Sequence, residues 1–400
     1  MITVGFTLIG RGAWSGGEAY QRNLLGVLAR ELAGEVQARL FLTPAQHERI
    51  GDALDPFLAG PAIVDPRVEG AGEGRRMAGI LLRGRDAAFA DLVAEHPVDV
   101  MFQSAQWLGE RFPVPLVSWI PDFQHRRLPH LFSLPAWARR DLGFRLQTSS
   151  GHLVMPSSQD ARLDCETFYP AARGRTRVAP FAVDLDPAPV LAAAGQIRAV
   201  HGLPDRFFYL PNQFWRHKNH TLVLEALRLL SVNGRLSDVP PVIMTGRTED
   251  PRDPGLFART MGQAADLGLD SHFRHLGLVS YGDVFALNAA ADALINPSLF
   301  EGWSTPVEEA KALGTPLLLS DLRVHREQAP EAAYFPIDDA WALAERMLDT
   351  GRAGPPQRPA ATLLMTRQAE RRADYARALK AVFESAVAER GPLRLRPDTG

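Results

Sequence analysis

The sequence predicts an α/β protein with two doubly wound domains. Short apolar segments alternate with longer segments of helical periodicity, which is typical of repeated βα units around a mostly parallel sheet. In the first series, we expect strands over 3–9, 38–42, 99–102 and 115–120, with helices over 19–32 and 76–95. In the second series, we expect strands over 207–210, 241–244, 273–276, 293–295 and 316–319, with helices between them.

A change in composition places the domain boundary near residue 184. The stretch VAPFAVDLDPAPVLAAAG is rich in Pro and Ala, which is typical of a hinge that runs into the first helix of a second domain. We therefore expect a first domain over 1–184 and a second over 185–370. A helix over 371–390 follows, for which a return to the first domain is one arrangement, and we expect the tail over 391–400 to fray.

Composition excludes several classes of protein. The 400 residues carry a formal net charge of −2, which does not indicate a nucleic-acid partner. The single cysteine, Cys165, cannot form an intrachain disulfide, and no Cys/His cluster has zinc spacing. The N-terminal apolar run lacks a basic leader, and no run reaches the roughly 18 residues of a membrane span. We therefore expect a cytoplasmic protein.

The segment LFEGWSTPVEEAKALGTP, residues 299–316, combines a strand end, a glycine turn and a helix start. Thr305, Pro306 and Glu308 match a capping box, and Gly314 stands where a left-handed C-terminal cap is expected. The N–H groups of a first helical turn carry roughly half a positive charge. The turn therefore predicts an anion site that needs no lysine in the loop.

Two glutamates beside this turn, Glu301 and Glu309, are interpreted as acceptors for sugar hydroxyls. A hydrogen bond to a charged group contributes roughly 1.5–3 kcal/mol. The alternative is that Glu309 complements the helix dipole, a contribution of about 0.3–1 kcal/mol, and that Glu301 is a solvated loop residue.

The same segment resembles the EGFGLPxxEAMAxGTP signature of retaining glycosyltransferases of family four, whose GT-B architecture has two Rossmann-like domains facing a central cleft. The resemblance extends to SGGEAYQRNLL, VMPSSQDARLDCETFYP and FRHLGLVSYGDVFALNAAADALINPSLFEG. It implies that Glu301 contacts the donor sugar and Glu309 the ribose. We assign Gly16 and Gly17 to the approach of the donor diphosphate. The resemblance also assigns sugar and phosphate binding to the backbone N–H groups of Gly302, Trp303, Ser304 and Thr305.

A departing nucleoside diphosphate needs fixed positive charge. Lys218 matches the family lysine on the first loop of the second domain, and lysine is rare in this chain. Asn212 stands where the family arginine is expected. We assign the missing charge to Arg216; the alternative is that Arg216 is a surface cation near a helix start.

The stretch VSWIPDFQHRRLP corresponds to the place where family members carry a His-Asp pair. Asp122 falls at the expected position, Pro121 replaces the histidine, and His125 follows. Asp122 and His125 are candidates to position the acceptor or the donor, and a structural hydrogen bond is the alternative role for His125. The resemblance implies front-face attack, with the leaving phosphate accepting the acceptor's proton.

Three other patterns are weaker. Gly10, Gly12 and Gly16 resemble a dinucleotide fingerprint, but the spacing is GxGxxxG and no acidic residue follows the second strand, so a dehydrogenase is a weak alternative. Asp184-Leu185-Asp186 imitates a metal-binding DxD motif, but it lies in the hinge. The segment 126–145 mixes arginines with apolar residues; it fits either an anionic membrane surface or a helix with a solvated basic face.

Together these observations predict a transferase that moves a hexose-type sugar from a nucleoside-diphosphate sugar to a glycan or lipid-linked acceptor, with retention of configuration. We expect no metal or other cofactor, no nucleic-acid partner, and a role in bacterial surface polysaccharide assembly. Peripheral contact with the inner face of the membrane is an added option. A nucleotide-sugar epimerase or hydrolase of the same fold and a catalytically silent nucleotide-binding scaffold remain alternatives.

Overall fold

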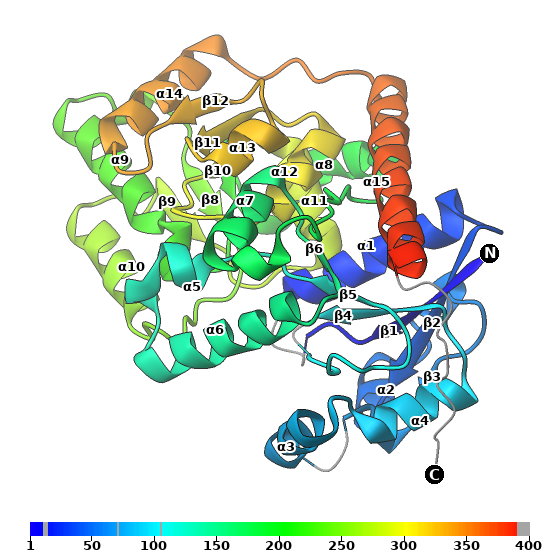
Figure 1. Cartoon of the computed structure of the whole chain (residues 1–400). Coiled ribbons are helices and arrows are strands. Elements are labelled where there is room, and N and C mark those ends of the chain that lie inside the picture. The colour runs from blue at the N-terminus through cyan, green and yellow to red at the C-terminus, as the bar shows by residue number, and fades with distance from the viewer. Residues whose placement is uncertain (11–14, 70–71, 105, 390–400) are drawn as a thin grey trace, which may run out of the picture. The chain divides into compact units, whose positions relative to one another are not determined.

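Figure 1 shows the computed structural model of the chain, which describes residues 1–10, 15–69, 72–104 and 106–389. The chain divides into two compact units. Unit 1 comprises Met1–Phe123, Leu134–Asp184 and the residues from Arg371, and unit 2 comprises Gln124–Ser133 and Leu185–Glu370. The expected first domain over 1–184 is therefore wrong in one respect, because Gln124–Ser133 makes its contacts with unit 2.

The described part of unit 1 contains a six-stranded parallel sheet with the order β3-β2-β1-β4-β5-β6. The strand order reverses between β1 and β4, as in other doubly wound folds. The strands are β1 (Ile2–Thr7), β2 (Val36–Leu42), β3 (Ile63–Val64), β4 (Val100–Ser104), β5 (Leu116–Trp119) and β6 (Leu153–Met155). The helices are α1 (Ser15–Glu31), α2 (Pro44–Ile50), α3 (Glu73–Arg83), α4 (Ala87–Glu95), α6 (Leu134–Ser149) and α7 (Gln159–Phe168).

The described part of unit 2 contains a second six-stranded parallel sheet, with the order β12-β11-β10-β7-β8-β9. Its order reverses between β7 and β10. The strands are β7 (Phe208–Leu210), β8 (Val242–Met244), β9 (Phe273–His275), β10 (Ala293–Asn296), β11 (Leu317–Ser320) and β12 (Ala333–Phe335). The helices are α5 (Gln124–Arg127), α8 (Pro187–His201), α9 (His220–Val232), α10 (Leu256–Asp266), α11 (Tyr281–Ala290), α12 (Thr305–Leu313), α13 (Arg323–Gln328) and α14 (Ala340–Ala353).

The core of unit 2 lies on both faces of its sheet. Alternate side chains of one strand point to opposite faces. On β7, Phe208 and Leu210 pack in the cluster that includes α9 and α14, whereas Tyr209 packs in the cluster that includes α8 and α11. Because both faces are covered, the strands are continuous apolar runs, which is why they could be recognised in the sequence.

The helix expected over 76–95 is two helices in the structure. Gly84 ends α3 in the left-handed conformation, with φ of 73°, and Asp86 caps α4 by accepting a hydrogen bond from the N–H of Phe89 at 3.2 Å. The turn between them is held against a neighbouring loop, since the N–H of Arg111 donates to the carbonyl oxygen of Gly84 at 2.8 Å. The break has a local cause: glycine allows the turn and aspartate starts the next helix.

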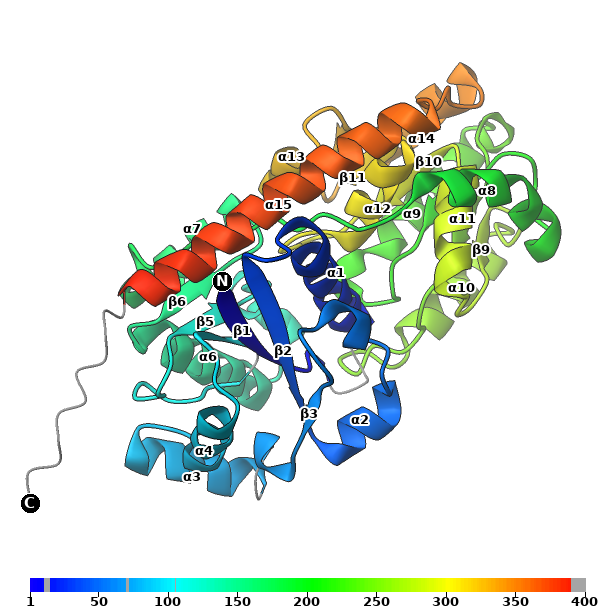
Figure 2. The same cartoon turned by 90° about the vertical axis from the view of Figure 1, so that its right-hand side faces the viewer.

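The C-terminal helix α15 (Ala361–Glu389) is one continuous helix (Figure 2). Its residues from Arg371 belong to unit 1. The guanidinium of Arg372 pairs with Glu31 at 2.5 Å and with Asp184 at 3.3 Å, and the Tyr375 hydroxyl lies 3.2 Å from that of Tyr20. These contacts fix this part of α15 against α1.

The carboxylates of the DxD-like triplet both have structural partners. Asp184 pairs with Arg30 at 2.9 Å as well as with Arg372. Asp186 caps α8 by accepting a hydrogen bond from the N–H of Ala188 at 3.0 Å. Within the described ranges, no helix is long and apolar enough to cross a membrane.

Gly109 provides a stability test of unit 1. Its φ is +96°, and a Cβ added there would lie 2.3 Å from the carbonyl oxygen of Gly84. Gly34 has a similar φ of +82° but open space around it. We expect Gly34→Ala to lower the free energy of unfolding by about 1–2 kcal/mol through backbone strain alone. Gly109→Ala should cost about 1–3 kcal/mol more, through overpacking. If denaturant titrations give the two variants equal losses of the free energy of unfolding, the close approach of Gly109 to Gly84 does not affect stability.

Candidate functional site

The candidate site lies in unit 2, where the carboxyl ends of β7 and β10 meet. The strand order reverses between these neighbouring strands, and ligands of open α/β sheets bind in the crevice outside such a point. The loop after β7 carries Asn212 and Lys218, and the loop after β10 carries Glu301. The fold thus brings together residues that are more than eighty positions apart in the sequence.

A buried ion pair joins the two loops. The Lys218 ammonium donates a hydrogen bond to Glu301 Oε1 at 2.6 Å, and the two side chains are only 13% and 8% exposed. The same carboxylate oxygen lies 2.7 Å from the Ser298 hydroxyl. Burial is the largest single effect and works to raise the pKa of Glu301, but the charge and hydrogen bond of Lys218, together with the nearby His325 and His217, outweigh it and lower the pKa to about 2. Glu301 is therefore an ionised acceptor and not a solvated loop residue.

The cations of this loop point in different directions. Arg216, His217 and Lys218 form a single 3-10 turn, in which successive side chains are about 120° apart. Lys218 meets Glu301, whereas Arg216 is exposed and lines a hollow of about 280 Å³ together with Arg259. The role expected for Arg216 beside Lys218 stays a prediction, and its present position does not bring the two charges together.

A second arginine, Arg252, contacts the 3-10 turn through His217. Its guanidinium pairs with the buried Asp250 carboxylate at 3.0 Å, and its Nη2 donates to His217 Nδ1 at 3.3 Å. Its Nη1 donates to Gln124 Oε1 at 2.9 Å. Burial of His217, reinforced by the charge of Lys218, lowers the pKa of His217 to about 3, so this imidazole is neutral and accepts from Arg252. Arg252 thus adds a fixed cation next to the residue that precedes Lys218.

Asn212, where the sequence resemblance led us to expect an arginine, has a structural partner. It is 2% exposed, and its amide donates to Asn296 Oδ1 at 3.1 Å. Asn296 in turn donates to the Ser304 hydroxyl at 2.9 Å. The side chains of Asn212 and Asn296 therefore connect the ends of β7 and β10 to the start of α12.

The start of α12 is held differently from the expected capping box. The helix begins at Thr305 with Ser304 as its N-cap, and no side chain caps it. Instead, Gln328 on α13 receives a hydrogen bond from the N–H of Ser304 at 3.1 Å and donates to its carbonyl oxygen at 2.8 Å. The expected capping box does not form, because the Glu308 side chain is buried, with 2% exposure, and is hydrogen-bonded to Lys311 and Gln328.

This arrangement limits which N–H groups are available to an anion. The Ser304 N–H, expected to bind sugar or phosphate, is already bonded to Gln328. The N–H groups of Gly302 and Thr305 have no hydrogen-bond partner among the residues that the structure describes. They are the donors at this turn that an anion could use, and Gly314 ends the same helix in the left-handed conformation, as expected.

Glu309 is buried in the middle of α12. It is 3% exposed, and its carboxylate accepts a hydrogen bond from the Tyr281 hydroxyl at 2.9 Å. Burial raises the pKa of Glu309 to about 7, against a smaller opposite effect of Tyr281. Glu309 therefore keeps its proton in slightly acidic solution and is about half protonated near pH 7. Neither the ribose role nor the helix-dipole alternative had led us to expect this protonation.

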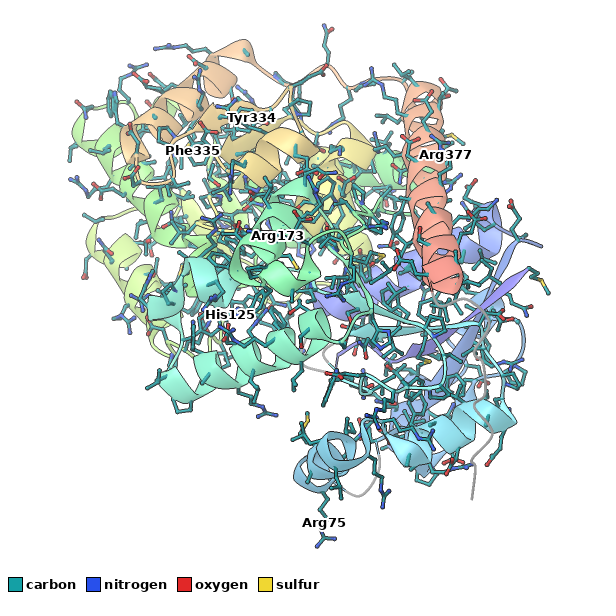
Figure 3. All side chains as sticks on the ribbon, viewed as in Figure 1. Arg75, His125, Arg173, Tyr334, Phe335 and Arg377 are labelled. Atoms are coloured by element: carbon teal, nitrogen blue, oxygen red, sulfur yellow. The ribbon has the colours of Figure 1, made fainter. Side chains whose placement is uncertain are left out.

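The remaining candidates lie outside this cluster. Asp122 belongs to unit 1 and pairs with Arg140 at 3.0 Å. His125, labelled in Figure 3, is fully buried on α5 and belongs to unit 2. Gly16 and Gly17 lie in the first turn of α1 in unit 1, and Gly12 lies outside the described residues. The structure thus assigns Asp122 and His125 to different units.

Sequence reasoning missed three residues of the cluster. Arg252 follows β8 at the carboxyl edge of the sheet, a position that could have drawn attention to it. Gln328 and Tyr281 left no signal, because a contact from a side chain to a distant backbone group or carboxylate has no periodicity. Trp303 lies in the turn, and Thr305 is the first residue of α12.

In a comparison with known families, residues 195–349 match the family described as glycosyl transferases group 1. The matched segment contains Lys218, Glu301 and Glu309. It covers most of unit 2.

Known proteins are similar to this chain at two levels. The O-antigen chain mannosyltransferase RfbU of Salmonella typhimurium is 28% identical over 149 residues, which are 36% of this chain and 39% of that protein. A glycosyltransferase from Rickettsia africae is similar in structure, with a TM-score of 0.65 at 14% identity over 96% of this chain and 98% of the other. HepE of Anabaena, solved with UDP and glucose, has a TM-score of 0.60 at 16% identity over 97% of both chains. The structural likeness confirms the expected α/β fold of GT-B type.

The raised pKa of Glu309 predicts a dependence of stability on pH. Folding raises this pKa from its usual 4.5 to about 7, so the folded state keeps a proton that the unfolded chain releases. The stabilisation is complete below about pH 4.5 and is lost as the pH rises to about 7. In denaturant titrations, we expect the free energy of unfolding of the wild type, relative to Glu309→Gln, to fall by up to about 3 kcal/mol over this window.

Glu301→Gln is the matched control. Because the pKa of Glu301 falls from its usual 4.5 to about 2 on folding, its titration in both states lies almost wholly below this window, and the difference in stability between wild type and Glu301→Gln should stay nearly constant. A constant difference for Glu309→Gln as well would contradict the raised pKa of Glu309.

Proposed function

We propose that this chain, whose residues 195–349 match the glycosyl transferases group 1 family, transfers a hexose-type sugar from a nucleoside-diphosphate sugar to a glycan or lipid-linked acceptor. The observation that carries the proposal is the buried Lys218–Glu301 pair at the carboxyl ends of β7 and β10. It combines a cation for a diphosphate with a carboxylate for sugar hydroxyls. A role in bacterial surface polysaccharide assembly is supported by the similarity to an O-antigen chain mannosyltransferase, which spans 39% of that relative.

In the proposed reaction, Lys218 and the free N–H groups of Gly302 and Thr305 stabilise the negative charge that develops on the leaving diphosphate. Glu301 accepts hydrogen bonds from hydroxyls of the donor sugar and holds its ring in place. The bond between the anomeric carbon and the phosphate oxygen breaks, and the acceptor oxygen forms the new bond. The acceptor's proton passes to the leaving phosphate, and the anomeric configuration is retained. We propose that these protein groups supply the required charge without a metal.

Glu309 is proposed to bind the ribose of the donor. A protonated carboxyl can donate one hydrogen bond and accept others, so a hydroxyl pair of the ribose can satisfy both functions. Tyr281 donates a hydrogen bond from its hydroxyl to Glu309, and the residue is 51% exposed.

A catalytically silent nucleotide-binding protein is the second candidate function. It is favoured by Asn212, whose amide is used in a buried hydrogen bond at the place where the family supplies an arginine. Donor binding without turnover would distinguish this candidate, and consumption of donor without an acceptor would instead indicate a hydrolase or epimerase.

Thermal unfolding with UDP, GDP, ADP, dTDP or NAD tests the donor site. A ligand at about a hundred times its dissociation constant adds about 2.7 kcal/mol to the free energy of unfolding. We expect one nucleoside diphosphate to stabilise the protein, and Glu309→Ala to weaken that effect. Stabilisation by NAD alone would favour a dehydrogenase and contradict the proposal.

Lys218→Ala tests the chemistry. Loss of one preorganised charge at the leaving group should lower kcat with the donor so identified by about a hundredfold to a thousandfold. Lys380→Ala is the matched control, because Lys380 forms a surface ion pair with Glu35 in unit 1, and its kcat should equal that of the wild type. Wild-type turnover of Lys218→Ala would remove Lys218 from the mechanism, and Arg216→Ala measured alongside would show whether that arginine takes part.

A further inference from the structure

Helix α3 in unit 1 exposes two large apolar side chains. Leu81 and Leu82 are 62% and 85% exposed, which makes Leu82 the most exposed large hydrophobic residue in the described ranges. Residues three and four positions apart share one face of a helix. Arg75, Ala78 and Leu82 have this spacing and are all exposed, so the apolar residues form part of an outer face with Arg75 at its amino end.

The opposite face of α3 is anchored to unit 1. Ile80 is 2% exposed, and the Arg76 guanidinium forms an ion pair with Asp86, which caps α4. Arg76 also donates a hydrogen bond to the carbonyl oxygen of Val68 at 2.9 Å. Because these contacts fix the inner face, the leucines cannot turn inward without breaking a buried ion pair.

Arginines surround the exposed leucines. Residues 73–85 contain four arginines and one glutamate. Arg75, Arg83 and Arg85 are exposed, and none of the three side chains has an ion pair or hydrogen bond with another described residue. Arg111, also exposed, packs against Gly84 at the end of the helix. Figure 3 shows Arg75 projecting away from the helix.

This combination of groups indicates the kind of partner. Weak apolar insertion and several cations are the two signals that together hold a protein on an anionic lipid surface. A second copy of the chain fits poorly, since a symmetric contact through this face would bring the same unpaired arginines against one another. The charge therefore favours phospholipid headgroups over self-association.

The segment 126–145, expected from its sequence to be a membrane candidate, is less suitable. Arg140 pairs with Asp122 at 3.0 Å and Arg145 pairs with Asp141 at 2.7 Å, so these cations are already neutralised. The segment is also divided between the two units at Leu134. The leucine and arginine face of α3 has neither limitation.

We propose that α3 is a membrane-docking helix, which inserts Leu81 and Leu82 into an anionic lipid surface while Arg75, Arg83, Arg85 and Arg111 contact the headgroups. The proposal does not rest on the transferase activity. It concerns a part of unit 1 that is separate in sequence from the Lys218–Glu301 cluster.

Sedimentation of the full chain with phospholipid vesicles tests the proposal. We expect binding to vesicles of phosphatidylcholine with about one third phosphatidylglycerol, and much weaker binding to phosphatidylcholine alone. Raising the salt from about 0.1 M to about 1 M should release the protein, because the Debye length falls from about 10 Å to about 3 Å. The double substitution Leu81→Gln/Leu82→Gln should weaken binding at least about tenfold. The triple substitution Arg75→Gln/Arg83→Gln/Arg85→Gln should weaken it roughly a hundredfold.

Matched controls lie elsewhere in the chain. Leu278→Gln replaces a leucine that is 69% exposed in unit 2, and Leu142→Gln replaces one that is 58% exposed on α6. Both should bind vesicles as the wild type does. Because all substituted side chains are exposed, thermal unfolding should be unchanged, and this is measured for each variant.

Three results would overturn the proposal. The first is equal binding by wild type and both α3 variants. The second is loss of binding in Leu142→Gln, which would move the contact to α6. The third is no binding to anionic vesicles together with a concentration-dependent dimer that the α3 substitutions dissociate, which would assign the face to a second copy.

Discussion

The buried pair of Lys218 and Glu301 is the interaction on which the arrangement of unit 2 depends. Removing charges from water is costly, and a pair with one partner deleted leaves a buried charge that typically costs about 3–5 kcal/mol. Each loop must therefore place its charge within about 3 Å of the other. The sheet makes this possible because β7 and β10 are neighbours whose carboxyl ends meet at one edge. The pair in turn fixes Glu301 in the ionised form.

The side chains around the pair show how the structure accommodates an asparagine at position 212. An arginine there would need a counter-charge and space, whereas the Asn212 amide is satisfied by Asn296. A positive charge beside the 3-10 turn comes instead from Arg252, whose counter-charge, the Asp250 carboxylate, is fully buried. Unit 2 thus carries Lys218 on the loop after β7 and Arg252 on the loop after β8. The neutral His217 joins the two loops by accepting a hydrogen bond from Arg252.

The sequence was sufficient to predict those features that depend on local patterns. Buried parallel strands are continuous apolar runs, so the strands around the site and the turn after β10 could be recognised, and Glu301 and Lys218 were expected near a common ligand. The direction of each side chain in the 3-10 turn was not predictable. Successive residues of such a turn point about 120° apart, so a shift of the turn by one residue changes the direction of Arg216 by that angle. The break at Gly84 has a local signal, but the assignment of Gln124–Ser133 to unit 2 and the bonds of Gln328 depend on tertiary contacts that no short segment encodes.

The bonds between Gln328 and Ser304 also have a kinetic and entropic consequence. A primary amide reproduces the donor and acceptor of a peptide group, so Gln328 holds one residue of the turn as a neighbouring strand would. The turn is ordered before any ligand arrives, and the conformational entropy of fixing it has already been lost in folding. A ligand that meets a preformed turn retains more of its contact energy as affinity, and its association need not wait for the loop to rearrange.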